Sequence, residues 1–162
     1  MKLSGGIEWA VHCCVVLSGV DAPVPAARLA ELHEVSGTYL AKQMQNLSRA
    51  GLVRSVQGKA GGYVLTRPPE QITMLDVVEA IEGTEPSFVC TEIRQRGPFA
   101  VPPEKCTRTC PIARAMYAAD DAWRASLREI TIADLVADVN SPTDVLSPVR
   151  AWLSGPAVEP AR

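Results

Sequence analysis

The chain has 162 residues, of which 47% are hydrophobic, and a net charge of −2. This length suits one domain, or one domain with appendages, and the apolar fraction is sufficient for a core. An odd number of cysteines, five, argues against a disulfide framework and favours a reducing cytoplasm. No apolar stretch is long enough to span a membrane, and Glu8 and His12 interrupt the apolar start too early for a signal peptide. We therefore expect a cytoplasmic protein with no membrane partner.

The first half of the chain carries the pattern of a helix-turn-helix. Apolar residues at helical spacing predict helices over 4–18 and 25–33, and a third begins at Ser36, whose hydroxyl can cap its first turn. Gly51 ends this third helix. Two strands are predicted next, over 52–57 and 63–66, joined by a glycine-rich tip that permits the positive φ angles of a hairpin. A helix followed by such a hairpin indicates a recognition helix with a wing.

The stretch 36–67 is also the cationic part of the chain. It contains five Lys and Arg residues and no acid, so it carries +5, and the remainder carries −7. A localised positive segment on an acidic body is typical of a phosphate-binding surface, which predicts a double-stranded DNA operator as partner. Polar side chains of the third helix that lie opposite its apolar positions are Tyr39, Lys42, Gln43, Asn46 and Arg49. The residues that we predict to contact DNA are Ser36, Thr38, Tyr39, Lys42, Gln43, Gln57 and Lys59.

The second half begins with a short helix over 74–82, which Thr73 caps and Gly83 ends. Residues 84–109 are rich in proline and read as a long functional loop. A long helix starts at Pro111, with an apolar stripe that predicts a homodimer seam. The stripe comprises Ile112, Met116, Ala119, Trp123, Leu127 and Ile130.

These elements predict a mainly α fold with a small β-wing, in which a winged helix-turn-helix domain is followed by a long dimerisation helix. The domain boundaries that we predict are 1–83 for the winged domain, 84–109 for the loop and 110–139 for the long helix with a short one after it. We expect 140–162 to form a flexible tail, although its apolar side chains could dock. Those side chains are Val149, Trp152 and Leu153.

Three cysteines lie in or beside the irregular loop, namely Cys90, Cys106 and Cys110. Cys110 stands at the start of a helix, where free amides and the helix dipole favour its thiolate. Thiolates select zinc, copper(I) or iron–sulfur clusters, but this spacing matches neither zinc fingers nor ferredoxins. Glu8 and His12 are four residues apart on the first helix and could bind one metal ion together. The alternative is an exposed Glu8 and a His12 whose hydrogen bonds are satisfied within the protein. We expect the adjacent Cys13 and Cys14 to be core residues and His33 to lie at the surface.

The wing motifs resemble those of a known family. Arg49-Ala50-Gly51-Leu52-Val53, Gly61-Gly62-Tyr63 and Arg67-Pro68-Pro69 are similar to those of the Rrf-two family of bacterial winged-helix regulators, which includes IscR and NsrR. The resemblance runs from about residue 3 to about residue 139. It implies a homodimer that binds DNA, and in many members an iron–sulfur cluster ligated from the loop before the long helix.

The cysteine intervals of sixteen and four differ from those of the commoner members. The set most resembles the RsrR-type, redox-sensing branch of the family. That resemblance implies a 2Fe–2S cluster held by Glu8, His12, Cys90 and Cys110, with Cys106 as a spare thiol or alternative ligand. Trp9, beside the ligands, is then a candidate redox-coupled switch, or else an ordinary core aromatic.

The function that we expect is a redox-responsive transcription regulator. The alternatives are a regulator switched by a Cys106–Cys110 disulfide, a nitric-oxide or iron sensor with a different cluster, and an iron–sulfur carrier. An enzyme with a small-molecule substrate is not expected, because the chain shows no nucleophile–base pairing and no phosphate loop.

Overall fold

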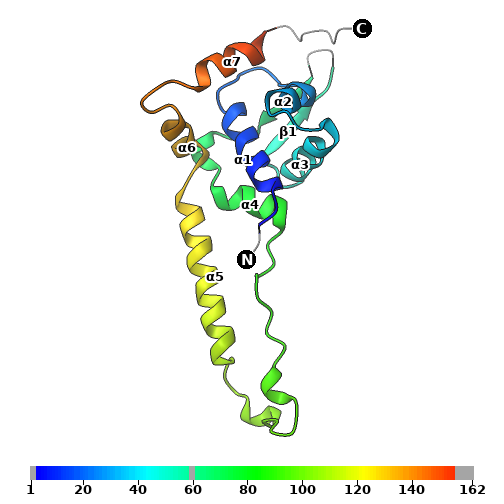
Figure 1. Cartoon of the computed structure of the whole chain (residues 1–162), viewed down its shortest axis with the longest axis vertical. Coiled ribbons are helices and arrows are strands. Elements are labelled where there is room, and N and C mark those ends of the chain that lie inside the picture. The colour runs from blue at the N-terminus through cyan, green and yellow to red at the C-terminus, as the bar shows by residue number, and fades with distance from the viewer. Residues whose placement is uncertain (1–2, 59–60, 156–162) are drawn as a thin grey trace. The chain divides into compact units, whose positions relative to one another are not determined.

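The computed structural model describes residues 3–58 and 61–155. These residues form seven α-helices, a two-stranded antiparallel sheet and three short 3₁₀ turns (Figure 1). They divide into two compact units. One unit is 84–126, and the other combines the described residues of 2–83 and 127–162. The mainly helical fold with a small wing is as predicted. The two units meet in the chain at 83/84, which coincides with one predicted boundary, and at 126/127.

The core of the larger unit forms around helix α1 (Gly6–Leu17), which contacts α3 (Gly37–Arg49), α4 (Met74–Glu82) and α6 (Ile132–Val139). Cys13 and Cys14 are fully buried in it, and this burial raises the pKa of each thiol to about 12. This confirms the prediction that both are core residues.

The helix-turn-helix consists of α2 (Ala26–Leu32) and α3. The hydroxyl of Ser36 accepts a hydrogen bond from the backbone N–H of Tyr39 at 3.2 Å, so Ser36 caps α3 as predicted. Leu40, Met44 and Leu47 of α3 are completely buried. Their spacing of four and three is what places them on one face of the helix.

The wing consists of β1 (Val53–Val56) and β2 (Gly62–Leu65), paired so that Val53 lies opposite Leu65. The segment before α2 extends this pairing, because Val24 and Tyr63 exchange backbone hydrogen bonds of 3.0 and 2.8 Å. At Gly62 a Cβ atom would lie 2.3 Å from the carbonyl of Val24. Only glycine fits here, and the Gly-Gly-Tyr sequence is therefore required by a close backbone approach.

Two capping boxes start α4 and α6, one built by Thr73 with Asp76 and the other by Thr131 with Asp134. The two starts lie side by side, since the N–H of Met74 donates to the carbonyl of Ile130 at 2.8 Å. The chain therefore returns to the larger unit after the long helix by a backbone pairing, which the sequence pattern did not predict.

The predicted flexible tail is in part a docked helix. Helix α7 (Leu146–Ser154) buries Leu146 and Leu153 in the core of the larger unit. The guanidinium of Arg28, on α2, stacks 3.4 Å from the ring centroid of Trp152 and donates to the Trp152 carbonyl. Residues 146–154 thus form a docked helix, which was the predicted alternative to a flexible tail. The cation–π interaction of the buried Arg28 with Trp152 stabilises this docking.

The smaller unit contains most of α5 (Pro111–Glu129), with the segment 84–90 extended along it (Figure 1). Arg124 connects the two, pairing with Asp120 at 2.8 Å and donating to the carbonyls of Thr84 and Glu85. The 3₁₀ turns η2 (Ile93–Gln95) and η3 (Pro103–Lys105) order the remainder of the loop. Among the residues described, no helix is long and apolar enough to cross a membrane.

Candidate nucleic-acid interface and cysteine loop

The exposed face of α3 includes one row of polar side chains. Thr38, Lys42, Gln45 and Arg49 follow one another at steps of four, three and four, and all four are exposed. Such spacing aligns them along one side of the helix, where they can enter a groove together. Sequence reasoning missed Gln45, although its helical phase relative to Lys42 could have identified it.

Gln43 lies elsewhere. Its side chain is only 4% exposed, and its Oε1 lies 2.8 Å from the position that a Cβ would take at Gly6 of α1. Residue 43 is three positions after Leu40 and four before Leu47, which places it in the buried row. This differs from the prediction that Gln43 contacts DNA: the side chain fills the interface between α3 and α1.

The other predicted DNA-contacting residues are at the surface where the structure describes them. Tyr39 and Gln57 are exposed, and Ser36 is exposed although its hydroxyl is engaged as the helix cap. Lys59, at the tip of the wing, lies outside the described residues.

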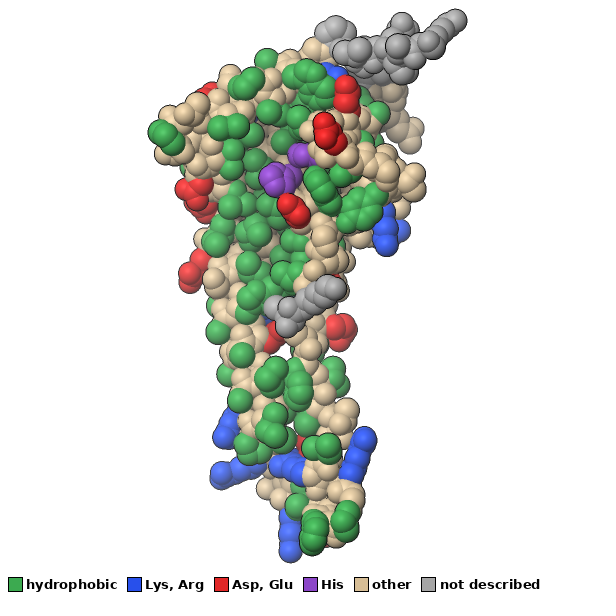
Figure 2. Space-filling view, in the orientation of Figure 1, with side chains coloured by type: hydrophobic (Ala, Val, Ile, Leu, Met, Phe, Trp, Pro, Cys, Tyr) green, Lys and Arg blue, Asp and Glu red, His purple; other side chains and the backbone are tan. Residues whose placement is uncertain are grey.

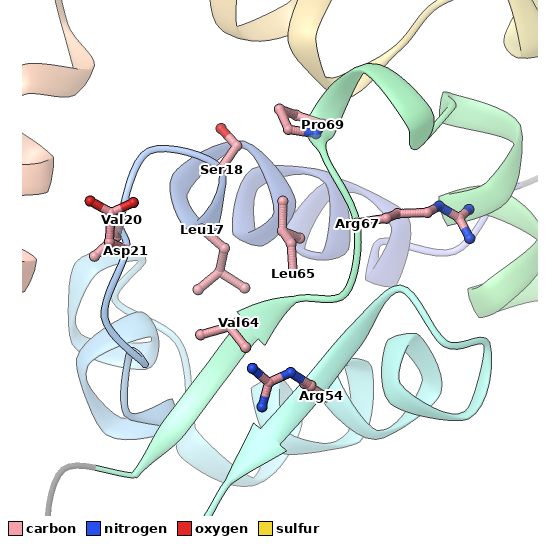
Figure 3. A pocket seen from close by; sticks show the side chains of 9 residues that line it. All are labelled: Leu17, Ser18, Val20, Asp21, Arg54, Val64, Leu65, Arg67 and Pro69. Carbon is pink, nitrogen blue, oxygen red and sulfur yellow. The ribbon is translucent and has the colours of Figure 1, made fainter.

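The cations of the wing are not equivalent. Arg67 pairs with Asp76 at 3.1 Å and donates to the carbonyl of Gln71, so its charge is partly neutralised. Arg54 is exposed and borders an open pocket of about 290 Å³ with an apolar wall that includes Leu17 and Val64. Figure 3 shows the Arg67 side chain directed away from Arg54. Among the wing residues that the structure describes, Arg54 is thus a cation available to a phosphate group.

The predicted ligands of the first helix share a surface. Glu8 and His12 are both exposed, and both line an open pocket of about 390 Å³ together with Ile7, Val11 and Met74. The structure therefore places a carboxylate and an imidazole beside one hollow large enough for a small inorganic group.

His33 joins this region, where the sequence had suggested only a surface residue. Its ring centroid lies 5.7 Å from that of His12 and 5.8 Å from that of Trp9, and the two histidines of the chain appear together in Figure 2. Burial and then the positive charge of His12 lower the pKa of His33. Its Nε2 atom is buried and has no hydrogen-bond partner among the residues that the structure describes. Trp9 is therefore packed on an imidazole at one end of α1.

In the smaller unit the three loop cysteines each interact with one ion pair, that of Glu92 with Arg94. The Cys90 thiol lies 3.8 Å from Glu92 Oε1. The hydrogen bond from Glu92 raises the pKa of Arg94, and Cys106 and Cys110 add to this effect, so both thiols lie within electrostatic range of its guanidinium. The backbone N–H groups of Ala113 and Ile112, at the start of α5, lower the pKa of Cys110, and Arg94 adds to the effect. The start of α5 therefore favours the thiolate of Cys110, as its place before Pro111 predicted.

Across residues 3–58 and 61–155 of a single chain, no three His, Cys, Asp or Glu side chains converge to hold a metal ion.

The profile of the Rrf2 family, described as an iron-dependent transcriptional regulator, matches residues 3–138. The chain belongs to the Rrf2 family. It is a transcriptional regulator of this family and not an enzyme. This confirms the predicted family, the Rrf-two regulators, and the winged fold.

Relatives and solved structures agree with this assignment. The chain is 30% identical over 155 residues to the putative HTH-type transcriptional regulator YwgB of Bacillus subtilis, covering 94% of this chain and 95% of that one. It is 41% identical over 89 residues to the HTH-type transcriptional regulator IscR of Cereibacter sphaeroides, covering 52% and 57%. The oxidised form of Staphylococcus aureus CymR superposes with a TM-score of 0.60 at 25% identity, over 84% of this chain and 96% of that one.

Proposed function

We propose that this regulator acts as a homodimer on a double-stranded DNA operator, and that a 2Fe–2S cluster controls its affinity for that operator. The observation that carries the redox part is the thiol chemistry of the loop. Three cysteines border one ion pair, and Cys110 is favoured as a thiolate by two backbone N–H groups. Iron–sulfur clusters require thiolates in a place where the backbone can wrap them.

The DNA-contacting part of the proposal rests on α3 and the wing. The side chains that would contact bases or phosphates in the major groove are those of Thr38, Tyr39, Lys42 and Gln45, with Ser36 at the helix start. From the wing, Gln57 and Lys59 would contact the phosphate backbone of the DNA. We leave Gln43 out of this set because it is buried against α1.

The proposed cluster ligands are Glu8, His12, Cys90 and Cys110, with Cys106 as the alternative thiol. Their chemistry fits the group, since Glu8 and His12 face one hollow and Cys110 is predisposed to ionise. When bound, the cluster would supply one-electron redox chemistry, and an imidazole among its ligands tends to raise the reduction potential.

The path from α1 to the DNA surface is short. Gly6, two residues before Glu8, is packed against Gln43 of α3 so closely that a Cβ atom would not fit without a shift of the Gln43 side chain. A displacement of the first turn of α1 would therefore move the helix that carries Lys42. Trp9, packed on His33, would change its contacts in the same displacement, as a redox-coupled switch requires.

Dimerisation is proposed from the apolar stripe of α5. Ile112 is 65% exposed and Met116 44% exposed in the single chain. Large apolar side chains at helical spacing that stay exposed indicate a protein interface. A two-fold dimer would present two copies of α3 to two half-sites.

The cluster is tested by purifying the protein under nitrogen. We expect a coloured protein with iron and sulfide in equal amounts, and loss of both in Cys90→Ala and in Cys110→Ala. Cys106→Ala should retain them. Colourless protein that binds DNA normally would refute the redox proposal, and loss of iron only in Cys106→Ala would refute the ligand assignment.

DNA contact is tested by the salt dependence of binding to a duplex enriched by the wild-type protein from a random pool. Lys42→Ala should weaken binding and reduce the slope of log K against log salt by about 0.9 if it meets one phosphate. Lys105→Ala removes the same charge from an exposed position in η3 and serves as the control. Equal slopes for both variants would contradict the proposed role of α3.

A second candidate is a cluster-free regulator switched by a Cys106–Cys110 disulfide. It is favoured by the position of both thiols within electrostatic range of one guanidinium, that of Arg94, and it needs an oxidant such as a peroxide. A Cys106–Cys110 disulfide found by mass spectrometry after peroxide treatment would favour this candidate over the cluster, provided that the nitrogen-purified protein shows no visible absorption.

A further inference from the structure

The ion pair inside the cysteine loop makes an additional contact. Arg94 Nε donates to Glu92 Oε2 at 2.6 Å, and its Nη2 lies 3.4 Å from Glu92 Oε1. The same Nη2 donates to the backbone carbonyl of Arg108 at 2.6 Å. One guanidinium thus holds a carboxylate and a carbonyl that are sixteen residues apart in the chain.

These two anchor points correspond to the two ends of the loop. Glu92 follows Cys90 by two residues, and Arg108 precedes Cys110 by two residues. The link through Arg94 therefore joins the segment that carries Cys90 to the segment that carries Cys110.

The backbone around Arg94 supports the same shape. Glu92 has a φ angle of +50°, a left-handed conformation that non-glycine residues adopt only when the surroundings hold them there. The carbonyl of Arg94 accepts a hydrogen bond of 2.8 Å from the N–H of Val101, which closes the turn. The side chain of Arg94 is 25% exposed, so the charged contacts are partly shielded from water.

We propose that Glu92, Arg94 and the carbonyl of Arg108 form a clasp that keeps the cysteine loop folded before any cluster is bound. Arg94 is then a positioning residue, which acts through the loop and not as a ligand. A loop that is already ordered loses less conformational entropy when it binds, so the clasp would favour loading and slow release. The second half of this inference rests on the proposed cluster function, whereas the first half does not.

The test compares Arg94→Gln with Arg96→Gln in the cluster-free protein. Arg96 is exposed, lies two residues away and carries the same charge. We expect amide hydrogen exchange over 92–110 to become several-fold faster in Arg94→Gln and to stay unchanged in Arg96→Gln. Equal exchange in the two variants would overturn the clasp, whether or not the wild type binds a cluster.

Arg94→Lys separates geometry from charge. Lysine keeps the positive charge but lacks the planar fork that bonds Glu92 and the carbonyl of Arg108 together. The clasp predicts fast amide exchange in this variant as well. Wild-type exchange in Arg94→Lys would mean that Arg94 acts through its charge alone, which would contradict the clasp.

In cluster-loaded protein, Arg94→Gln should lose its visible absorption to a chelator several-fold faster than Arg96→Gln, with the same thermal melt of the helices. Absence of a cluster from the wild type would refute the proposed function and leave the exchange result to decide the clasp.

Discussion

The docking of α7 on the helix-turn-helix depends on a single buried arginine. Arg28 is 5% exposed, and its guanidinium stacks on the Trp152 ring at 3.4 Å and donates to the Trp152 carbonyl. Its ion pair with Glu31, at 3.2 Å, contributes little to stability because the Glu31 side chain is 53% exposed and water screens the charges. We therefore attribute the stabilising effect of Arg28 to its two contacts with Trp152.

The magnitude follows from those contacts. A shielded cation–π pair contributes about 1–2 kcal/mol. A hydrogen bond from a charged donor contributes about 1.5–3 kcal/mol, part of which is offset by burial of the guanidinium. We expect Arg28→Ala to lower the free energy of unfolding by about 3 kcal/mol. Trp152→Leu, which removes the ring and leaves the backbone carbonyl, should cost about 2 kcal/mol.

The assay is a double-mutant cycle in urea, followed by circular dichroism so that loss of a tryptophan does not affect the signal. Because both single variants remove the same stacking contact, we expect a coupling free energy of about 1–2 kcal/mol. The control is Arg150→Ala combined with Trp152→Leu, since Arg150 is on the same helix and has no cation–π contact with Trp152 among the described residues. Coupling indistinguishable from zero for Arg28 and Trp152 would refute this reasoning.

Three further predictions concern other parts of the chain. In cluster-free protein at neutral pH, iodoacetamide should modify Cys110 before the two adjacent cysteines of α1, which should react only after denaturant is added, because the thiolate is the reactive form; mass spectrometry of the digested protein checks the order. Gly62→Ala should lower the melting temperature by several degrees, whereas Gly37→Ala, where a Cβ meets nothing within 4 Å, should not; equal melts would contradict the close approach to Val24. Thr73→Val should cost about 1 kcal/mol in urea unfolding through the lost helix cap, and no change would show that the capping box is dispensable.

Most of the helices and both strands could be predicted from the sequence, because local rules decide them. The spacing of Leu40, Met44 and Leu47 specifies which face of α3 is buried, and Ser36, Thr73 and Gly51 mark helix ends through the chemistry of their own backbone and side chains. The place of Cys110 before Pro111 was sufficient to predict a thiolate-favouring helix start. Each of these inferences involves residues within about two helical turns of each other.

The tertiary structure decided the contacts between distant segments. Arg28 and Trp152 are 124 residues apart, and no local pattern shows that one would cover the other. The burial of Gln43 against Gly6 depends on how closely α1 and α3 approach, and the link from Arg94 to the carbonyl of Arg108 depends on the path of an irregular loop. Long-range packing and loop closure depend on the whole chain at once, which is why only the folded protein reveals them.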